Sequence, residues 1–329
     1  MYCIAKDRKT FRTITGSACA VVDYSLTLDS IYDETSEISI TGAESAPTAG
    51  DFIYLENGYQ GIAQEVEKND GRIDLKCRQV SSLFSRELYY SKPEGETLEM
   101  RLKNMIDTNY TKQPDGLYRL PYLEVRALTS TSADTRPEID DNGIYTVDAY
   151  MAKLARLHNI FVTCVFGRDT LAVEIARKVV PSRKIDFSDP GLNVTEQAFS
   201  CEKIGKITSR AEDTGKVRDW YLLRDGTITN SADAPERVEG DWKLLTVREE
   251  QDTTDAVADE FRSNSYSHKI TFTAAPEKAR FSFYDRVTIA LDGNLFDSYI
   301  AAVRVKKDSG LTEYECGELR TTYPFKKLI

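Results

Sequence analysis

Alternation of apolar and polar residues around glycine turns is the feature that most constrains how this chain folds. In the stretch 58–80 (GYQGIAQEVEKNDGRIDLKCRQV), an apolar run meets an Asn-Asp-Gly turn, and alternation resumes through Ile73, Leu75 and Cys77. Such a turn between two alternating segments is a strong signal for a β-hairpin. We expect the acidic residues of this stretch on its solvent-facing side, namely Glu65, Glu67, Asp70 and Asp74. The stretch therefore predicts a hairpin with no catalytic or metal site attached.

This hairpin has a similar partner near the C-terminus. Residues 66–77 (VEKNDGRIDLKC) align without gaps to 305–316 (VKKDSGLTEYEC), and four of the twelve positions are identical. Upstream of each, 51–58 (DFIYLENG) parallels 285–293 (DRVTIALDG). Two unrelated hairpins with the same turn chemistry would also look alike. The shared order of both pieces favours the alternative, a duplicated β unit whose copies are separated by insertions.

Composition excludes several classes of protein. The formal net charge of −10 argues against sequence-independent nucleic-acid binding, because phosphate neutralisation needs Lys and Arg. The six cysteines show no CxxC and no short zinc spacing, so we expect free buried thiols in a reducing compartment. The N-terminus lacks an apolar signal core, and no apolar run approaches the roughly 20 residues that span a bilayer. We therefore expect synthesis in the cytoplasm and no membrane insertion.

The predicted elements are segregated along the chain. Helices are predicted where apolar residues recur at helical spacing, over 97–110, 145–159 and 252–263. A hairpin is predicted over 160–177, and the segment 111–143, which is rich in helix and strand breakers, is expected to be a long irregular connection. Strand patterns dominate the remainder. This order predicts a mainly β fold with α+β insertions.

The quoted stretches also carry a family resemblance. Residues 50–88 and 283–319 resemble the baseplate hub, or tail-hub, family of tailed phages, which includes the N-terminal part of siphophage tail-associated proteins. The first stretch matches the family's succession of strand, glycine turn, strand, D-G turn and a strand running into "x-x-L-x-x-R", here Ser82-Leu83-Phe84-Ser85-Arg86. The resemblance implies two tail-tube-like β-barrel or sandwich units in one chain, plus a helix-containing middle region.

The resemblance also implies a domain plan. It predicts a first tube-like β domain over 1–92, a helix-and-hairpin insertion over 93–184, a strand-rich middle domain over 185–250, and a second tube-like unit over 251–329 that closes on the first. The residues expected to form shared core or interface positions are Ile53, Val66, Ile73, Leu75, Val287, Ile289, Val305 and Tyr314.

The implied function is structural. The resemblance predicts a homotrimeric, pseudo-hexameric ring at the virion tail tip that caps or continues the tail tube around a DNA channel. Expected partners are further copies of the chain, a distal tail or tail-tube protein, the tape-measure protein and tail fibre or spike proteins, with DNA only passing through. Many relatives continue into a peptidase, muramidase or fibre region. This chain stops at Ile329, so we expect lytic or fibre functions in another chain.

No enzymatic chemistry is predicted, and we expect no catalytic residue, cofactor or metal. The sequence has two histidines, no GxSxG and no nucleotide-binding glycine motif. The acidic turn at 140–143 is not an EF-hand, because position 149 is Ala. Two alternatives remain: a carbohydrate- or receptor-binding protein that uses Trp220 and Trp242, although core packing is the default for both, and a cell-wall hydrolase that uses Glu65 or Asp140.

Overall fold

The computed structural model forms two compact units, which are described separately. The first comprises Met1–Asn193 and Phe272–Glu315, and the second comprises Val194–Thr271 with Cys316 and Gly317. The residues that the structure describes are 1–15, 18–29, 34–85, 87–90, 94–132, 143–178, 183–199, 204–223, 228–235, 237, 239–263, 268–275, 277, 280–291 and 294–317. The expected four-part division stays a prediction.

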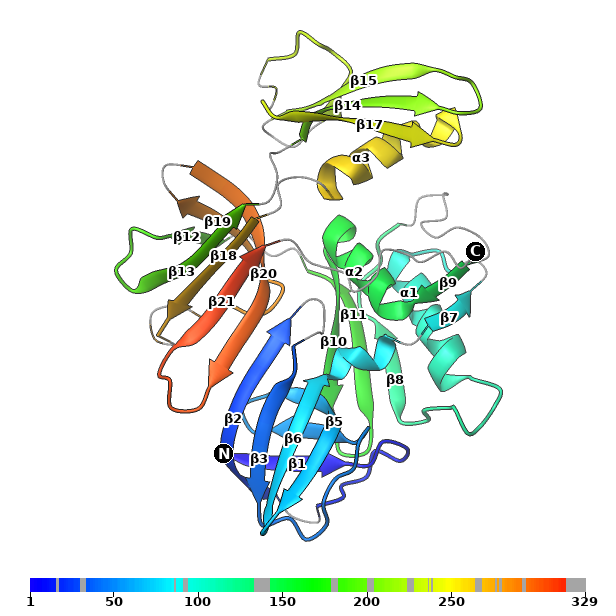
Figure 1. Cartoon of the computed structure of the whole chain (residues 1–329). Helices are drawn as coiled ribbons and strands as arrows, with labels where there is room; N and C mark the ends of the chain where they lie inside the picture. The colour runs from blue at the N-terminus through cyan, green and yellow to red at the C-terminus, as the bar shows by residue number, and fades with distance from the viewer. Residues whose placement is uncertain are drawn as a thin grey trace. The chain divides into compact units, whose positions relative to one another are not determined.

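Six strands at the N-terminus form a closed barrel (Figure 1). They are β1 (Tyr2–Lys6), β2 (Cys19–Asp29), β3 (Ser36–Thr41), β4 (Phe52–Leu55), β5 (Gln60–Asn69) and β6 (Arg72–Gln79). Their order is β1-β4-β5-β6-β3-β2, and the additional pairing of β1 with β2 closes the ring. Closure removes the unpaired sheet edges that would otherwise be open to aggregation.

The predicted hairpin turn joins β5 to β6. Asp70 and Gly71 have φ values of 42° and 81°, which suits the left-handed turn that two antiparallel strands prefer. Alternate residues of β6 point inward, so Ile73, Leu75 and Cys77 are buried. The hairpin prediction for 58–80 is therefore confirmed.

Two helices and a small sheet follow the barrel within the first unit. The elements are η1 (Val80–Phe84), β7 (Glu87–Tyr90), α1 (Leu98–Ile106), η2 (Asp107–Thr111), β8 (Leu123–Ala127), β9 (Gly143–Thr146), α2 (Val147–His158), β10 (Ile160–Phe166) and β11 (Leu171–Arg177). β10 and β11 form the predicted hairpin, while β7 pairs with β9. The expectation of an irregular connection over 111–143 is wrong for β8, which pairs in parallel with β11.

Aromatic side chains pack the barrel against this insertion. The Phe11 ring lies 5.3 Å from that of Phe52 and 5.1 Å from those of Tyr122 and Phe166, between ring centroids. Phe11 and Phe52 are fully buried. They share one hydrophobic core with α1, α2 and β11. Burial of aromatic surface stabilises such a contact strongly, so the barrel and the helices form one body.

A second set of six strands repeats the strand order of the barrel. It contains β12 (Arg183–Asp186), β13 (Leu192–Phe199), β18 (His268–Ala274), β19 (Arg286–Leu291), β20 (Asn294–Lys306) and β21 (Thr312–Gly317), in the order β12-β19-β20-β21-β18-β13. When the six strands of each set are numbered in chain order, both sets have the spatial order first, fourth, fifth, sixth, third, second. The mainly β fold with helical insertions is confirmed. One difference is that β12 pairs with β19 in parallel, whereas β1 pairs with β4 antiparallel.

The second unit contains a sheet of four strands and one helix. The strands are β14 (Ile204–Ala211), β15 (Val217–Leu222), β16 (Ile228–Thr229) and β17 (Asp241–Val247), and η3 (Glu250–Asp252) leads into α3 (Thr253–Ser263). Their order is β16-β15-β14-β17. Val257 and Phe261 of α3 pack on Ile207, Trp220 and Leu222. Across the described ranges, none of the helices has the length and apolar character needed to cross a membrane.

The buried carboxylate of Glu99 joins α1 to the segment that follows β8. It accepts hydrogen bonds from Thr129 Oγ1 at 2.6 Å and from Thr131 N and Oγ1, both at 2.8 Å. Burial raises the pKa of Glu99, but these hydrogen bonds outweigh it, and the net effect is a lowered pKa. We expect Glu99→Gln to reduce the free energy of unfolding by about 1–3 kcal/mol, because the amide cannot accept all three bonds.

The same substitution should change how stability depends on pH. A carboxylate whose pKa is lowered on folding stabilises the protein above its unfolded pKa and loses that effect as the pH falls. Unfolding should therefore be measured between pH 7 and pH 3. The wild-type protein should lose stability as the pH falls below 4.5, the ordinary pKa of a glutamate, and the variant should lose less. The exposed Glu96 offers the control Glu96→Gln. Equal stability of both variants at pH 7 would contradict the prediction.

Candidate functional site

The barrel (β1 to β6) and the second set of six strands, which we call the second β unit, meet at one strand pair, β2 with β20. Residues Ser25 to Asp29 of β2 pair antiparallel with Lys306 to Ala302 of β20. The first half of β20 pairs with β19 instead. β20 therefore belongs to the second β unit and also extends the barrel sheet at β2. The barrel and the second β unit thus share a continuous ladder of strands at this pair.

A charged cluster around Arg304 lies beside this strand pair. Its guanidinium donates to Glu34 Oε2 at 2.7 Å, to Glu313 Oε1 at 3.2 Å and to Glu315 Oε2 at 3.0 Å. Glu34 precedes β3, whereas the other two carboxylates belong to β21. The hydrogen bonds to Glu34 and Glu315 raise the pKa of Arg304 above its usual range. One side chain thus ties the barrel to the second β unit.

The strongest local sign of duplication is a turn that both units share. Asp51 Oδ2 accepts from Thr48 N at 2.7 Å, and Asp51 N donates to Thr48 O at 3.1 Å. Asp285 Oδ2 accepts from Ser282 N at 2.9 Å, and Asp285 N donates to Ser282 O at 3.0 Å. The spacing of a hydroxyl residue three positions before Asp is visible in the sequence and could have signalled this turn.

The backbone around the turn agrees as well. Ala63 N donates to Asp51 O and Ile300 N donates to Asp285 O, both at 2.9 Å. The residue before each Asp has a left-handed φ, 93° at Gly50 and 72° at Tyr284. The two β units therefore share a strand order, a capped turn and an unusual backbone conformation, which unrelated hairpins have no reason to share.

The aligned hairpins also bury corresponding residues. Leu75 and Tyr314 are buried, as are Cys77 and Cys316, and Gly71 and Gly310 both have positive φ. Position 76 is the exception, because Lys76 is exposed and its counterpart Glu315 is buried. The exception follows from Arg304, which gives Glu315 a partner.

The structure places most of the predicted shared positions in cores. Six of them are buried, namely Ile53, Ile73, Leu75, Val287, Ile289 and Tyr314. Val66 and Val305 are half-buried. Ile53, Ile73 and Leu75 come together in the barrel core with Val66 at its margin, and the Tyr314 ring stacks on Phe272 at 5.3 Å. A role for any of the eight between chains stays a prediction.

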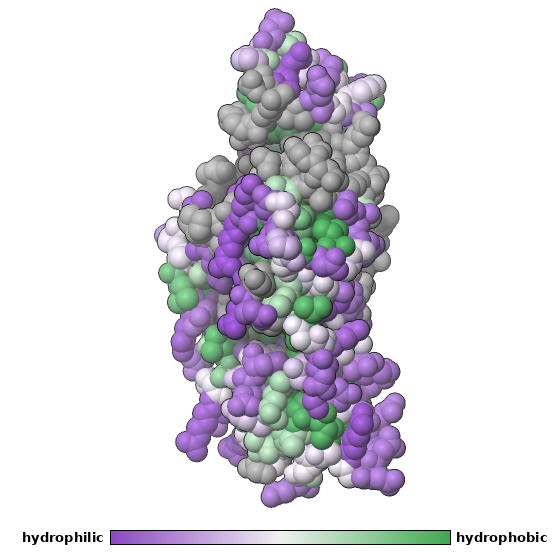
Figure 2. Space-filling view, turned by 90° about the vertical axis from the view of Figure 1, so that its left-hand side faces the viewer, coloured by the Kyte–Doolittle hydropathy of each residue, from purple (hydrophilic) through white to green (hydrophobic). Residues whose placement is uncertain are grey.

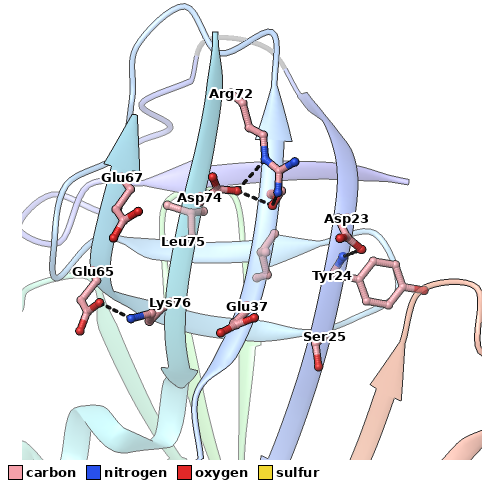
Figure 3. A pocket seen from close by; sticks show the side chains of 12 residues that line it. Asp23, Tyr24, Ser25, Glu37, Glu65, Glu67, Arg72, Asp74, Leu75 and Lys76 are labelled. Carbon is pink, nitrogen blue, oxygen red and sulfur yellow. Dashed lines mark hydrogen bonds and ion pairs between the residues drawn. The ribbon is translucent and has the colours of Figure 1, made fainter. Parts of the chain in front are cut away.

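Three of the four acidic residues of the opening hairpin, Glu65, Glu67 and Asp74, line a hollow of about 290 Å³ on the outer wall of the barrel (Figure 3). Lys76 Nζ bonds Glu65 Oε2 at 2.7 Å, and Arg72 Nε bonds Asp74 Oδ1 at 2.8 Å. Hydrogen bonds from Ser39 and Arg72 lower the pKa of Asp74, the opposite of what a general acid requires. The hydrolase reading gains no support here, and its other candidate, Asp140, lies outside the described residues.

The two tryptophans have different environments. Trp220 is buried, and its Nε1 donates to Ser209 Oγ at 2.7 Å. Trp242 is 60% exposed, because it lies on the face of the sheet opposite α3. The prediction that both tryptophans pack in a core is therefore wrong for Trp242. The alternative that both form an exposed aromatic binding surface is wrong for Trp220.

No disulfide joins the cysteines in the described part of the chain. Cys3, Cys19, Cys77 and Cys316 are buried, and burial raises the pKa of Cys164 to about 12. Cys201 lies outside the described residues. Within the described part of the chain, no group of three or more His, Cys, Asp or Glu side chains is placed to hold a metal ion.

The surface visible in Figure 2 carries both hydrophilic and hydrophobic side chains. Hydrophobic residues lie there in separate patches among hydrophilic ones. Scattered exposed apolar residues are normal on a protein surface. The organised features of the chain are therefore the paired β units rather than a broad apolar area on this face.

Comparison with known proteins identifies the fold. No family model and no curated protein sequence matches the chain. Among solved structures, the chain is similar to a protein of the phage P2 baseplate in its activated conformation (TM-score 0.52, 10% identity, covering 97% of this chain and 99% of that one). It is also similar to prophage tail protein gp18 from Listeria monocytogenes EGD-e (TM-score 0.54, 10% identity, 96% and 94%).

A third similar structure is the 43 kDa tail protein of prophage MuSo2 from Shewanella oneidensis (TM-score 0.51, 13% identity, 97% and 99%). These alignments cover nearly the whole of each chain. The expected resemblance to phage baseplate and tail proteins is therefore confirmed at the level of the fold.

The Arg304 cluster gives a direct test of how the β units are joined. We expect Arg304→Gln to lower the free energy of unfolding by about 3–5 kcal/mol, because the buried carboxylate of Glu315 loses its charged hydrogen-bond donor. The double variant Arg304→Gln with Glu315→Gln should recover part of that loss in denaturant titrations. Lys306→Gln, at an exposed position on the same strand, is the control. A loss below about 1 kcal/mol for Arg304→Gln would show that the cluster is not a structural link.

Proposed function

We propose that this chain is a structural protein of a phage or prophage tail, a baseplate hub that forms a homotrimeric ring. The ring caps or continues the tail tube at the tail tip and surrounds a channel through which DNA passes. The observation that carries the proposal is the repeated strand order with its shared Asp turn, in a chain whose whole length has the fold of phage tail proteins.

The repeated unit supports the symmetry of this assembly. Most soluble oligomers have closed rotational symmetry. A trimer of a chain with two similar β units has six similar positions around one axis, so it can adapt a three-fold tip to a six-fold tube. The two units differ in detail, which is what pseudo-six-fold rather than true six-fold symmetry requires.

The proposed partners follow from this position. They are other copies of the chain, a distal tail or tail-tube protein, the tape-measure protein and fibre or spike proteins. The chain is proposed to be made in the host cytoplasm and to act without catalysis.

The mass of the purified full-length chain in solution tests the proposal. Light scattering over a range of concentrations should give three times the chain mass of 37.1 kDa, and negative-stain images should show rings. The measurement is repeated with the neighbouring tail-tube protein, since a hub can require that neighbour in order to close. A compact monomer under both conditions would exclude the ring.

A further inference from the structure

One face of the sheet in the second unit carries an ordered array of exposed side chains. α3 packs on the face with Ile207, Trp220 and Leu222, and strand side chains alternate between faces. The pairing register therefore aligns the intervening residues of the opposite face in three rows: Tyr221, Lys206 and Trp242; Asp219, Thr208 and Leu244; Val217, Arg210 and Thr246.

The apolar members of this array are unusually exposed. Trp242 is 60% exposed, Leu244 66% and Val217 58%. Exposed aromatic side chains with neighbouring arginines are typical of the energetic centres of protein interfaces. The two aliphatic residues favour a protein surface over a saccharide, which would stack on aromatic rings.

The array is also basic on an acidic chain. Lys206 and Arg210 lie in it, and the Arg237 guanidinium covers the Tyr221 ring at 5.0 Å from the centroid. Asp219 is the acidic member, and Lys206 Nζ neutralises it at 2.8 Å. Complementary charge favours an acidic partner surface and suppresses wrong partners.

The chain itself offers such a surface on the barrel wall. The hollow in Figure 3 is lined by five acidic side chains and two basic ones, the acidic ones being Asp23, Glu37, Glu65, Glu67 and Asp74. Its volume of about 290 Å³ offers a recess for a protruding apolar side chain. The charge of the hollow is thus complementary to that of the array around Trp242.

We propose that the Trp242 face of one copy docks onto the acidic hollow on the barrel of another copy. The contact joins different surfaces of the two copies, and such a contact either closes into a ring or continues as a filament. The inference rests on the proposed self-assembly and names the interface that would produce it.

Self-association of full-length variants, measured by sedimentation equilibrium, tests this interface. Trp242→Ser should weaken association at least 10-fold. Arg210→Glu with Arg237→Glu should weaken it similarly, as should Glu37→Arg with Glu67→Arg on the barrel. Combining all four charge reversals should restore association towards the wild-type level. Leu117→Ser, at an 87% exposed position outside both surfaces, should have no effect, and circular dichroism verifies that each variant is folded.

The outcomes separate this inference from the proposed function. If the wild-type chain forms trimers and every variant forms them equally well, the docking inference is wrong and the proposed hub function is unaffected. A wild-type monomer would overturn both. Binding to purified peptidoglycan that Trp242→Ser abolishes, with the mass unchanged, would show a saccharide platform and overturn the docking inference.

Discussion

The antiparallel ladder between β2 and β20 is the interaction on which the arrangement of the first unit depends. β2 needs β1 to close the barrel at one end, and at the other end it takes β20 as a neighbour. Unpaired strand edges are a liability in water, and here each β unit covers an edge of the other. The long β20 is therefore the strand that joins the barrel to the second β unit.

Much of this arrangement follows from local sequence. Asn-Gly and Asp-Gly turns between alternating segments specify hairpins through backbone geometry alone, so β5 and β6 could be predicted. Helical spacing likewise predicted α1 and α2. The helix expected over 97–110 is α-helical only to Ile106, and it continues as the π-helical turn η2 from Asp107. The fold class could be inferred because these signals are local and mutually consistent.

The remainder depends on partners that are distant in sequence. β8 has only five residues, and its parallel partner β11 begins well after it along the chain, so no turn signal announces the pair. Trp220 and Trp242 lie in similar strand contexts, and only the position of α3 decides which one is buried. Arg304 was missed for the same reason, since its carboxylate partners are brought together by the β2–β20 ladder.

The shared Asp turn shows how the two β units have diverged. In the barrel the left-handed position is Gly50, where glycine adopts positive φ without strain. In the second β unit it is Tyr284, whose ring lies 5.5 Å from that of Phe161. A bulky residue at positive φ is a conformational outlier, and it persists here beside an aromatic contact with the insertion.

That difference has a consequence for whatever meets the proposed ring. A six-fold tube would encounter two kinds of turn in alternation, one with a glycine at the left-handed position and one with an aromatic ring packed on the chain's own insertion. A neighbour that recognises the glycine turn would find three sites and not six. This turn would then add to the departure from hexagonal symmetry that the other differences between the two β units produce, and it would offer three-fold fibres or spikes a site that occurs once in each copy.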